Sequence, residues 1–243
     1  MRGWKYANDP EYQYYRKSEA DILEGWKRLG EDACSRGSFF HISAEYHCNN
    51  IHANDESPEF LQYLAFRASH PHLIPYRTEM LIFDEAYRIV GSVDAIFHNL
   101  HTNKYLIVDW KRSKKVTGKG GDVGFWPIDH LRSNNLTKYS IQQVVVFGVA
   151  RLCYTNALLR RCRLSLYTYI LEQNYGLDME ESALVVCHPN QDTYNMIRTK
   201  YLRDDVEMML NYRLLCMYKQ GIIPMPLDIA QNESIAWELI RCL

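Results

Sequence analysis

Three short runs rich in Ile, Val, Phe and Tyr lie close together in the middle of this 243-residue chain. They cover residues 77–83, 86–97 and 104–111, and only short polar segments join them. Short polar connections between β-forming runs favour consecutive hairpins, so these residues predict a three-stranded antiparallel meander. The rest of the fold has to pack around that sheet.

Segments with a helical spacing of apolar residues flank the meander on both sides. Before it, we expect a helix over 18–33, a second from residue 37, and a third over 58–68 that starts with Ser57 as cap and Pro58 as first helical residue. After it, we expect a helix around 166–172, a buried strand over 183–187, a long helix over 193–219 and a short helix near Ile235. This order predicts an α+β fold with helices flanking one small, mostly antiparallel sheet, in a single domain over 1–243.

The composition narrows the classes of partner and compartment. The 28 Lys and Arg residues balance 29 Asp and Glu residues, which argues against a general polyanion binder, so any nucleic-acid contact needs a local basic patch. The seven cysteines contain no C-x-x-C pair, which argues against a zinc ribbon and favours reduced intracellular thiols. No run reaches the ~18 apolar residues of a membrane helix, and the first residues lack the apolar core of a signal peptide. We therefore expect an intracellular protein that is neither secreted nor held in a membrane.

Two acidic residues and one lysine fall near the ends of neighbouring strands of the meander. Asp94 ends the sequence 91–94, Gly-Ser-Val-Asp, in the second strand, and Asp109 and Lys111 end the third. Strand alternation puts Asp109 and Lys111 on one face with Trp110 opposite, and a hairpin can set Asp94 beside them. Two carboxylates this close are unfavourable unless a cation neutralises them, which predicts a Mg²⁺ or Mn²⁺ site. The alternative is a cross-strand salt bridge on an exposed sheet face.

These residues, in this order, resemble the core of the PD-(D/E)XK nucleases. The closer resemblance is to the branch that contains the RecB nuclease domain and phage lambda exonuclease. Upstream, the segment 36–41 with Glu45 one turn later resembles the small pair and metal-binding histidine of that branch, and 75–79 resembles its first core strand. Downstream, Gln142 and the segment 164–172 with Tyr167 resemble its Gln-x-x-x-Tyr helix. The resemblance covers about residues 20–215 and implies a restriction-endonuclease-like core.

The resemblance also implies roles for individual residues. It implies a Mg²⁺- or Mn²⁺-dependent nuclease, exonuclease or endonuclease, that hydrolyses phosphodiester bonds, in DNA rather than RNA. Lys111 would orient or deprotonate an attacking water, or stabilise charge in the transition state. The metal ligands would be His41, Asp94 and Asp109, with the Trp110 carbonyl as a fourth candidate. Asp94, Asp109 and Lys111 would form the catalytic group together with Gln142 and Tyr167, and Glu45 and Glu79 would be second-tier candidates. The phosphate contacts would come from Arg77, Arg112, Lys114 and Lys115.

Two stretches stand out from the rest of the chain. Residues 112–137 form a basic, glycine-rich segment that we expect to be an exposed loop beside the site. Residues 143–163 contain four Arg and two Cys but no Asp, Glu or Lys, and they separate Gln142 from Tyr167. Removing 143–163 would place Gln142 four positions before Tyr167, one helical turn away.

The stretch 143–163 has two interpretations. It is either a retained intron or another error of the gene structure, or it is a real insertion that gates the substrate. A continuous helix through these 21 residues would displace Tyr167 from Gln142 by about a further 30 Å, which puts the activity of this chain in question. Two further alternatives stay open: a nuclease-fold module that binds nucleic acid without cutting it, and an unrelated α+β interaction protein whose acidic and basic residues form salt bridges.

Overall fold

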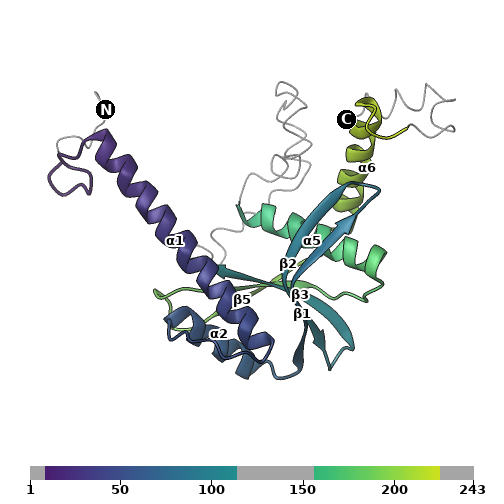
Figure 1. The fold of residues 1–243 in the computed structure, drawn as a ribbon, viewed down its shortest axis with the longest axis horizontal. Coiled ribbons are helices and arrows are strands. Elements are labelled where there is room, and N and C mark those ends of the chain that lie inside the picture. The colour runs from purple at the N-terminus through teal and green to yellow at the C-terminus, as the bar shows by residue number, and fades with distance from the viewer. Residues whose placement is uncertain (1–8, 114–155, 225–243) are drawn as a thin grey trace.

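The structure, a computed structural model, describes residues 9–113 and 156–224. Two helices precede a meander of three strands, and a further helix, two strands and a helix follow it (Figure 1). The elements are α1 (Glu19–Cys48), α2 (Pro58–Ser69), β1 (Leu73–Asp84), β2 (Ile89–Asn99), β3 (Lys104–Arg112), α5 (Asn156–Tyr175), β4 (Ser182–Cys187), β5 (Asn195–Thr199) and α6 (Arg203–Lys219).

The strands form one five-stranded sheet in the order β1-β2-β3-β4-β5. All neighbouring strands are antiparallel except β3 and β4, which are parallel. The meander predicted from the three apolar runs is confirmed, and so is the α+β class with a mostly antiparallel sheet flanked by helices. The single parallel pair arises because the chain crosses from β3 to β4 through α5.

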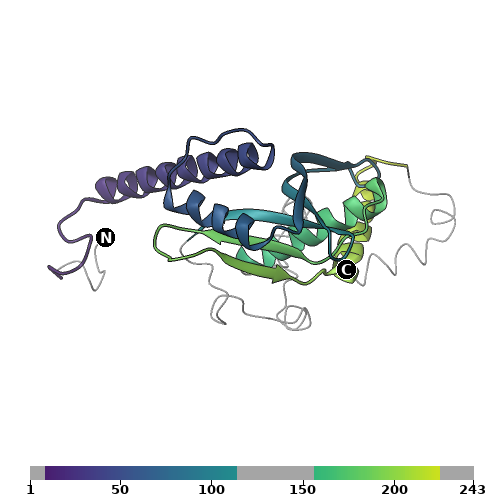
Figure 2. The same cartoon turned by 90° about the horizontal axis from the view of Figure 1, so that it is seen from below.

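Each face of the sheet has its own apolar core. Helices α1 and α2 lie over one face of the sheet (Figure 2). Their Phe40, Tyr63 and Phe66 side chains share a buried cluster with Trp110 of β3. The other core joins α5 and α6 to the opposite face of the same strands. Its side chains include Val93, Ile96, Ile107, Leu164, Ile170, Leu184, Val206 and Leu210. The sheet is therefore the middle layer, and a residue's position along a strand decides which pair of helices it meets.

The helix starts follow the sequence signals. The Ser57 side chain accepts a hydrogen bond from the Phe60 amide, and Pro58 is the first residue of α2, as predicted. Ser18 and Asp21 form a reciprocal capping box at the start of α1. The break expected before residue 37 is wrong: α1 runs unbroken from Glu19 to Cys48. One Gly within a long helix costs only about 1 kcal/mol, and the buried residues Ile22 and Phe40 lie about five turns apart on the same face of this continuous helix.

Two other expectations about elements are corrected. The long helix expected over 193–219 is replaced by strand β5 and the shorter helix α6. Met196 and Ile197 of β5 pack on opposite faces of the sheet, so the apolar pair that fitted a helix follows a strand period. The second strand begins at Ile89 rather than residue 86, because the Asp84 carboxylate accepts the Tyr87 amide and holds residues 85–88 in a turn.

The stretch 143–163 is described in part. Its last residues, 156–163, form the first turns of α5 and run without a break into the segment that carries Tyr167. Gln142, Lys114, Lys115, residues 143–155, most of the 112–137 loop and the helix expected near Ile235 lie outside the described residues. Within 9–113 and 156–224, no helix is both long and apolar enough to cross a membrane.

Candidate active site

Strands β2 and β3 separate at one end of their ladder, and the site lies in the fork between them. They pair from Asn99 opposite Lys104 to Ala95 opposite Val108. Beyond Val108, β3 continues to pair with β4, as far as Arg112. The Trp110 amide, which faces the departing strand, donates instead to the Asp94 carboxylate at 2.9 Å. The fork therefore leaves Asp94 and Asp109 facing each other from two strands.

A kink in β1 and β2 opens this fork. Glu79 of β1 and Asp94 of β2 lie opposite each other, between the pairs Thr78–Ala95 and Met80–Val93. Val93 and Ala95 are two residues apart yet pack in opposite cores, so β2 twists at Asp94. Glu79 has a φ of 44°, a conformation that destabilises a non-glycine residue by about 1 kcal/mol or more and that is enriched at functional sites.

Three side chains from three elements meet at the kink. His41 comes from α1, Glu79 from β1 and Asp94 from β2, and one ligand atom of each lies within 4.8 Å of the other two. His41 Nδ1 is 3.4 Å from Asp94 Oδ2, and the Ser92 hydroxyl donates to Glu79 Oε2 at 3.3 Å. The sequence analysis treated Glu79 as second-tier, but the structure puts it beside His41 and Asp94.

Burial, and then a neighbouring carboxylate, raises the pKa of two acids in this cluster. Burial raises the pKa of Asp94, and the nearby Asp109 raises it further, whereas Lys111, His41 and the Trp110 amide act in the opposite direction. Burial also raises the pKa of Glu79, followed by the charge of Asp94. Three acidic groups therefore share a partly buried site in which a further cation would stabilise the ionised forms.

Lys111 lies between the two aspartates, as predicted from strand alternation. Its Nζ is 2.6 Å from Asp109 Oδ2 and 3.9 Å from Asp94 Oδ2, and it donates to the Trp110 carbonyl at 2.9 Å. The Trp110 ring lies on the other face, fully buried against α1 and α2. The Trp110 carbonyl, which the sequence analysis offered as a metal ligand, is thus a partner of Lys111 in this structure.

Asp109 has a second cationic partner that the sequence analysis did not anticipate. Arg163 of α5 donates from Nη2 to Asp109 Oδ1 at 2.5 Å. The Asp109 side chain is 4% exposed, and Lys111 and Arg163 approach its two oxygens separately. Arg163 was overlooked because it ends the stretch 143–163. Arg163 lies one helical turn before Tyr167 and therefore on the same face of a helix, and this spacing could have indicated that it reaches the site.

Tyr167 lies across β2 at the position where that strand has a glycine. A Cβ added to Gly91 would come within 2.5 Å of Tyr167 Cε1 and 2.8 Å of its hydroxyl oxygen. Burial raises the pKa of the Tyr167 hydroxyl, while the neighbouring Arg163 and a hydrogen bond to the Ser92 backbone lower it. The absence of a Cβ at Gly91 therefore allows Tyr167 of α5 to lie close against β2 beside the fork.

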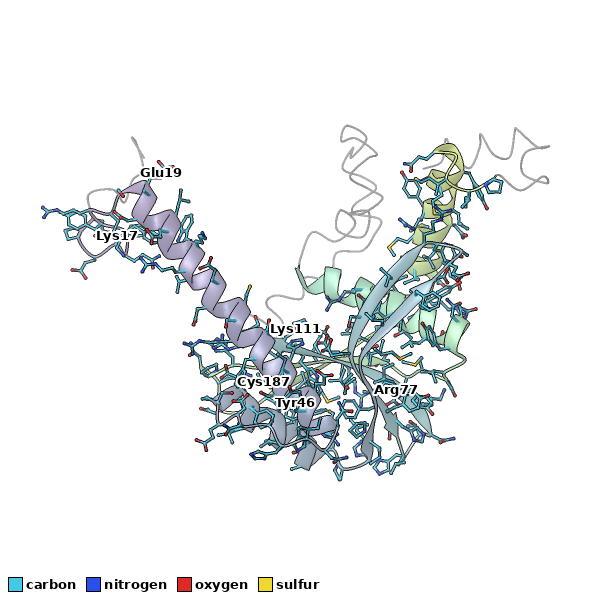
Figure 3. All side chains as sticks on the ribbon, in the orientation of Figure 1. Lys17, Glu19, Tyr46, Arg77, Lys111 and Cys187 are labelled. Atoms are coloured by element: carbon cyan, nitrogen blue, oxygen red, sulfur yellow. The ribbon has the colours of Figure 1, made fainter. Side chains whose placement is uncertain are left out.

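The remaining predicted residues lie around or away from the cluster. Glu45 lies one turn after His41 on α1, and its charge contributes to the raised pKa of Glu79. Arg77 is exposed, with its guanidinium carbon 5.8 Å from the centre of the Tyr76 ring, and Figure 3 shows it well apart from Lys111. The hydrogen bond and ion pairs given above for the Asp94 carboxylate involve Trp110, His41 and Lys111 rather than Glu45 or Arg77.

The predicted phosphate contact of Arg112 is corrected by the structure. Its guanidinium forms an ion pair with Glu59 of α2 at 2.5 Å, and the two side chains are only 12% and 6% exposed. Arg112 therefore holds α2 against the edge of β3 and does not face the fork. Strand alternation explains this outcome, because Lys111 and Arg112 are consecutive and must point to opposite faces.

The donor set fits a divalent cation. An imidazole nitrogen with carboxylate oxygens suits Mn²⁺, and the oxygens alone suit Mg²⁺. In an octahedral shell with bonds of about 2.1 Å, neighbouring ligand atoms lie about 3.0 Å apart, so the donor atoms of His41, Glu79 and Asp94, now within 4.8 Å of one another, would have to move closer together to share an ion. The residues present can thus hold such an ion, with Asp109 as a further ligand if it leaves its two cationic partners.

No protein-family model matches this chain, and no curated protein matches it either.

Proposed function

We propose that this protein is a divalent-metal-dependent nuclease that hydrolyses phosphodiester bonds, with DNA as the favoured substrate. The observation that carries the proposal is the fork between β2 and β3, where metal donors from three elements lie beside the Lys111 ammonium. The resemblance of the sequence to the RecB-like branch of the PD-(D/E)XK nucleases supports the same function, and it is the sole basis for preferring DNA to RNA.

The chain's own residues suit this chemistry. A divalent cation held by His41, Glu79 and Asp94 would supply Lewis acidity and neutralise charge on the scissile phosphate. Lys111 is held between Asp109 and Asp94, so a phosphate bound in the fork would have an ammonium group nearby that could stabilise charge gained by its oxygens. Because Lys111 is 19% exposed, it can reach a ligand in the fork without leaving its partners.

The thiols fit the proposed intracellular location. Among the described residues, Cys34, Cys48, Cys187 and Cys216 are free thiols. Burial raises the pKa of the Cys187 thiol to about 12, so it stays protonated and unreactive. We propose an intracellular location on the grounds of these thiols, and a nucleic-acid partner on the grounds of the resemblance.

A cleavage assay with a matched pair of lysine variants tests the proposal. Labelled linear double- and single-stranded DNA, with an RNA of the same sequence in parallel, would be incubated with Mg²⁺, Mn²⁺ or EDTA. Lys111→Met should reduce the cleavage rate by about 100-fold or more, since a positioned charge in the transition state is lost. Lys104→Met removes a lysine from the same strand, where it pairs with Asp178, and should leave the rate unchanged.

The outcomes separate the alternatives. Cleavage that needs the metal and is lost only in Lys111→Met supports the nuclease. Equal rates in both variants, or cleavage that persists in EDTA, contradict it. Faster cleavage of RNA than of DNA would keep the nuclease and overturn the preference for DNA.

One observation favours a second candidate, a module that binds nucleic acid without cutting it. Both oxygens of Asp109 are already approached by side-chain cations, which is the arrangement expected of a site that has no need of that carboxylate for metal. Retention of DNA in a gel-shift assay, without cleavage under any metal condition, would support this candidate over the nuclease.

A further inference from the structure

We propose that Arg163 closes the site against metal by holding Asp109, and that a divalent cation must displace it to gain this ligand. This inference rests on the proposed function, because it concerns how the same site is regulated. It assigns Arg163 the role of a positioning residue that acts through Asp109.

The contacts of Asp109 are the first step in the argument. Arg163 Nη2 lies 2.5 Å from Asp109 Oδ1, and Lys111 Nζ lies 2.6 Å from Asp109 Oδ2. A metal ion would therefore compete with a side-chain cation for either oxygen. Oδ2 is among the buried side-chain oxygens of the described residues that accept no well-aligned hydrogen bond. Its contact with Lys111 is therefore ionic only, and Arg163 makes the aligned bond that fixes the carboxylate.

The contrast with Asp94 is the second step. Asp94 faces His41 and Glu79, and its nearest cationic side chain, Lys111, is 3.9 Å away. One aspartate of the fork thus belongs to a cluster of possible metal ligands, while the other is neutralised by side chains. Removing the positive charge of Arg163 would leave the buried Asp109 carboxylate with Lys111 as its one remaining cationic partner among the described residues, and its Oδ1 would be open to an entering cation.

The exposure of the two partners decides which of them can leave. The Arg163 side chain is 43% exposed, whereas that of Lys111 is 19% exposed. An arginine at the edge of the site can swing into solvent and be rehydrated there, but Lys111 is enclosed between two aspartates and the Trp110 carbonyl. Arg163 is therefore the partner that an entering cation displaces.

We call the ion pair between Arg163 and Asp109 the clamp. The position of Arg163 in the chain links this clamp to the stretch 143–163. Arg163 is the last residue of that stretch and precedes Tyr167 by one helical turn. A chain without 143–163 would have Gln142 at this position, directly before Leu164. Glutamine has no charge, so the shorter chain would lack the clamp. The substitution Arg163→Gln reproduces this change without altering the length of α5.

Mn²⁺ binding to the full chain is the test, because it is read without any cleavage. The dissociation constant would be measured by electron paramagnetic resonance of free Mn²⁺ and by calorimetry, for the wild type, Arg163→Gln and Arg163→Lys. We expect Arg163→Gln to bind Mn²⁺ at least about tenfold more tightly, since an ion pair to a buried carboxylate no longer has to break. Arg163→Lys keeps the charge and should stay within about threefold of the wild type.

Two further variants make the test specific. Arg203→Gln is the matched control, because Arg203 pairs with Glu172 of α5 and with Glu207, away from the fork. It should leave Mn²⁺ binding unchanged. In an Asp109→Asn background, Arg163→Gln should give no gain, since the carboxylate through which Arg163 acts is absent. Circular dichroism would confirm that each variant is folded.

The outcomes distinguish failure of the clamp from failure of the nuclease. Equal Mn²⁺ affinity in folded wild type and Arg163→Gln overturns the clamp, and so does a gain that persists in the Asp109→Asn background. Tighter binding in Arg163→Gln, with no cleavage of DNA or RNA by any variant, supports the clamp and contradicts the nuclease. No Mn²⁺ binding by any variant at millimolar concentration overturns both, because the site then holds no metal.

Discussion

The buried ion pair between Arg112 and Glu59 gives a prediction whose size follows from the structure. Arg112 closes β3, and Glu59 lies in the first turn of α2, so the pair joins a helix to the sheet. Replacing Arg112 by Met removes the charge and keeps much of the side-chain volume. Glu59 would then be left as a carboxylate that is 6% exposed, without its cation.

The expected loss of stability is large because the remaining charge is buried. Removing one partner of a buried ion pair costs about 3–5 kcal/mol. For a chain of this length each kcal/mol shifts Tm by about 2–4 °C, so Arg112→Met should lower Tm by roughly 6–20 °C. Replacing both residues, Arg112→Met with Glu59→Met, should recover most of the loss, since apolar side chains of similar volume often substitute for a buried pair.

Thermal unfolding followed by circular dichroism, with DNA binding measured in parallel, checks this account. Arg28→Ala is a suitable control because it removes an arginine from an exposed ion pair with Glu24, and Tm should change by no more than about 4 °C. A Tm of Arg112→Met equal to that of the wild type would refute the structural role. If DNA affinity fell at the same time, Arg112 would be a nucleic-acid contact after all.

Three other predictions follow from residues near the fork and at the helix starts. Gly91→Ala should cost about 1–3 kcal/mol in urea unfolding, because the added Cβ meets the Tyr167 ring, and much less in a Tyr167→Ala background where that ring is absent. Folding raises the pKa of Glu79 and Asp94, so as pH rises from about 4 the unfolded chain loses these protons before the folded chain does, and the free energy of unfolding falls. Glu79→Gln should make this fall smaller in metal-free protein. An unchanged dependence of stability on pH would contradict the raised pKa of Glu79. Ser57→Ala should cost about 1 kcal/mol in the same unfolding assay, and no loss would mean that the cap of α2 is dispensable.

Local sequence patterns predicted much of the sheet and the centre of the site. Alternation along 104–111 placed Asp109 and Lys111 together and Trp110 on the opposite face, as observed. Alternation works here because β3 is a regular strand with one helical layer on each side. The start of α2 was also predicted from neighbouring residues alone, with Ser57 as cap and Pro58 as first helical residue, and this prediction is confirmed.

The features that sequence patterns missed depend on contacts between distant segments. Glu79 joined the cluster because β1 and β2 kink together, and nothing in its neighbourhood marks a residue with positive φ. Arg112 looked like part of a basic run, but its partner Glu59 lies far away in the chain. Arg163 was set aside with the stretch that it ends, although α5 is continuous there. In each case the deciding partner comes from another element.

The parallel pairing of β3 and β4 has a consequence for the order of folding. The hairpins β1–β2 and β2–β3 close over short turns, whereas the β3–β4 ladder must bring together strands separated by the whole of α5 and the chain before it. Long closures are entropically unfavourable and slow, so this ladder should form after the hairpins. His41, Glu79 and Asp94 depend on α1 and the early hairpins, while the seat of Arg163 depends on the later crossover. A refolding chain should therefore acquire its cluster of metal donors before it acquires the contact that closes Asp109.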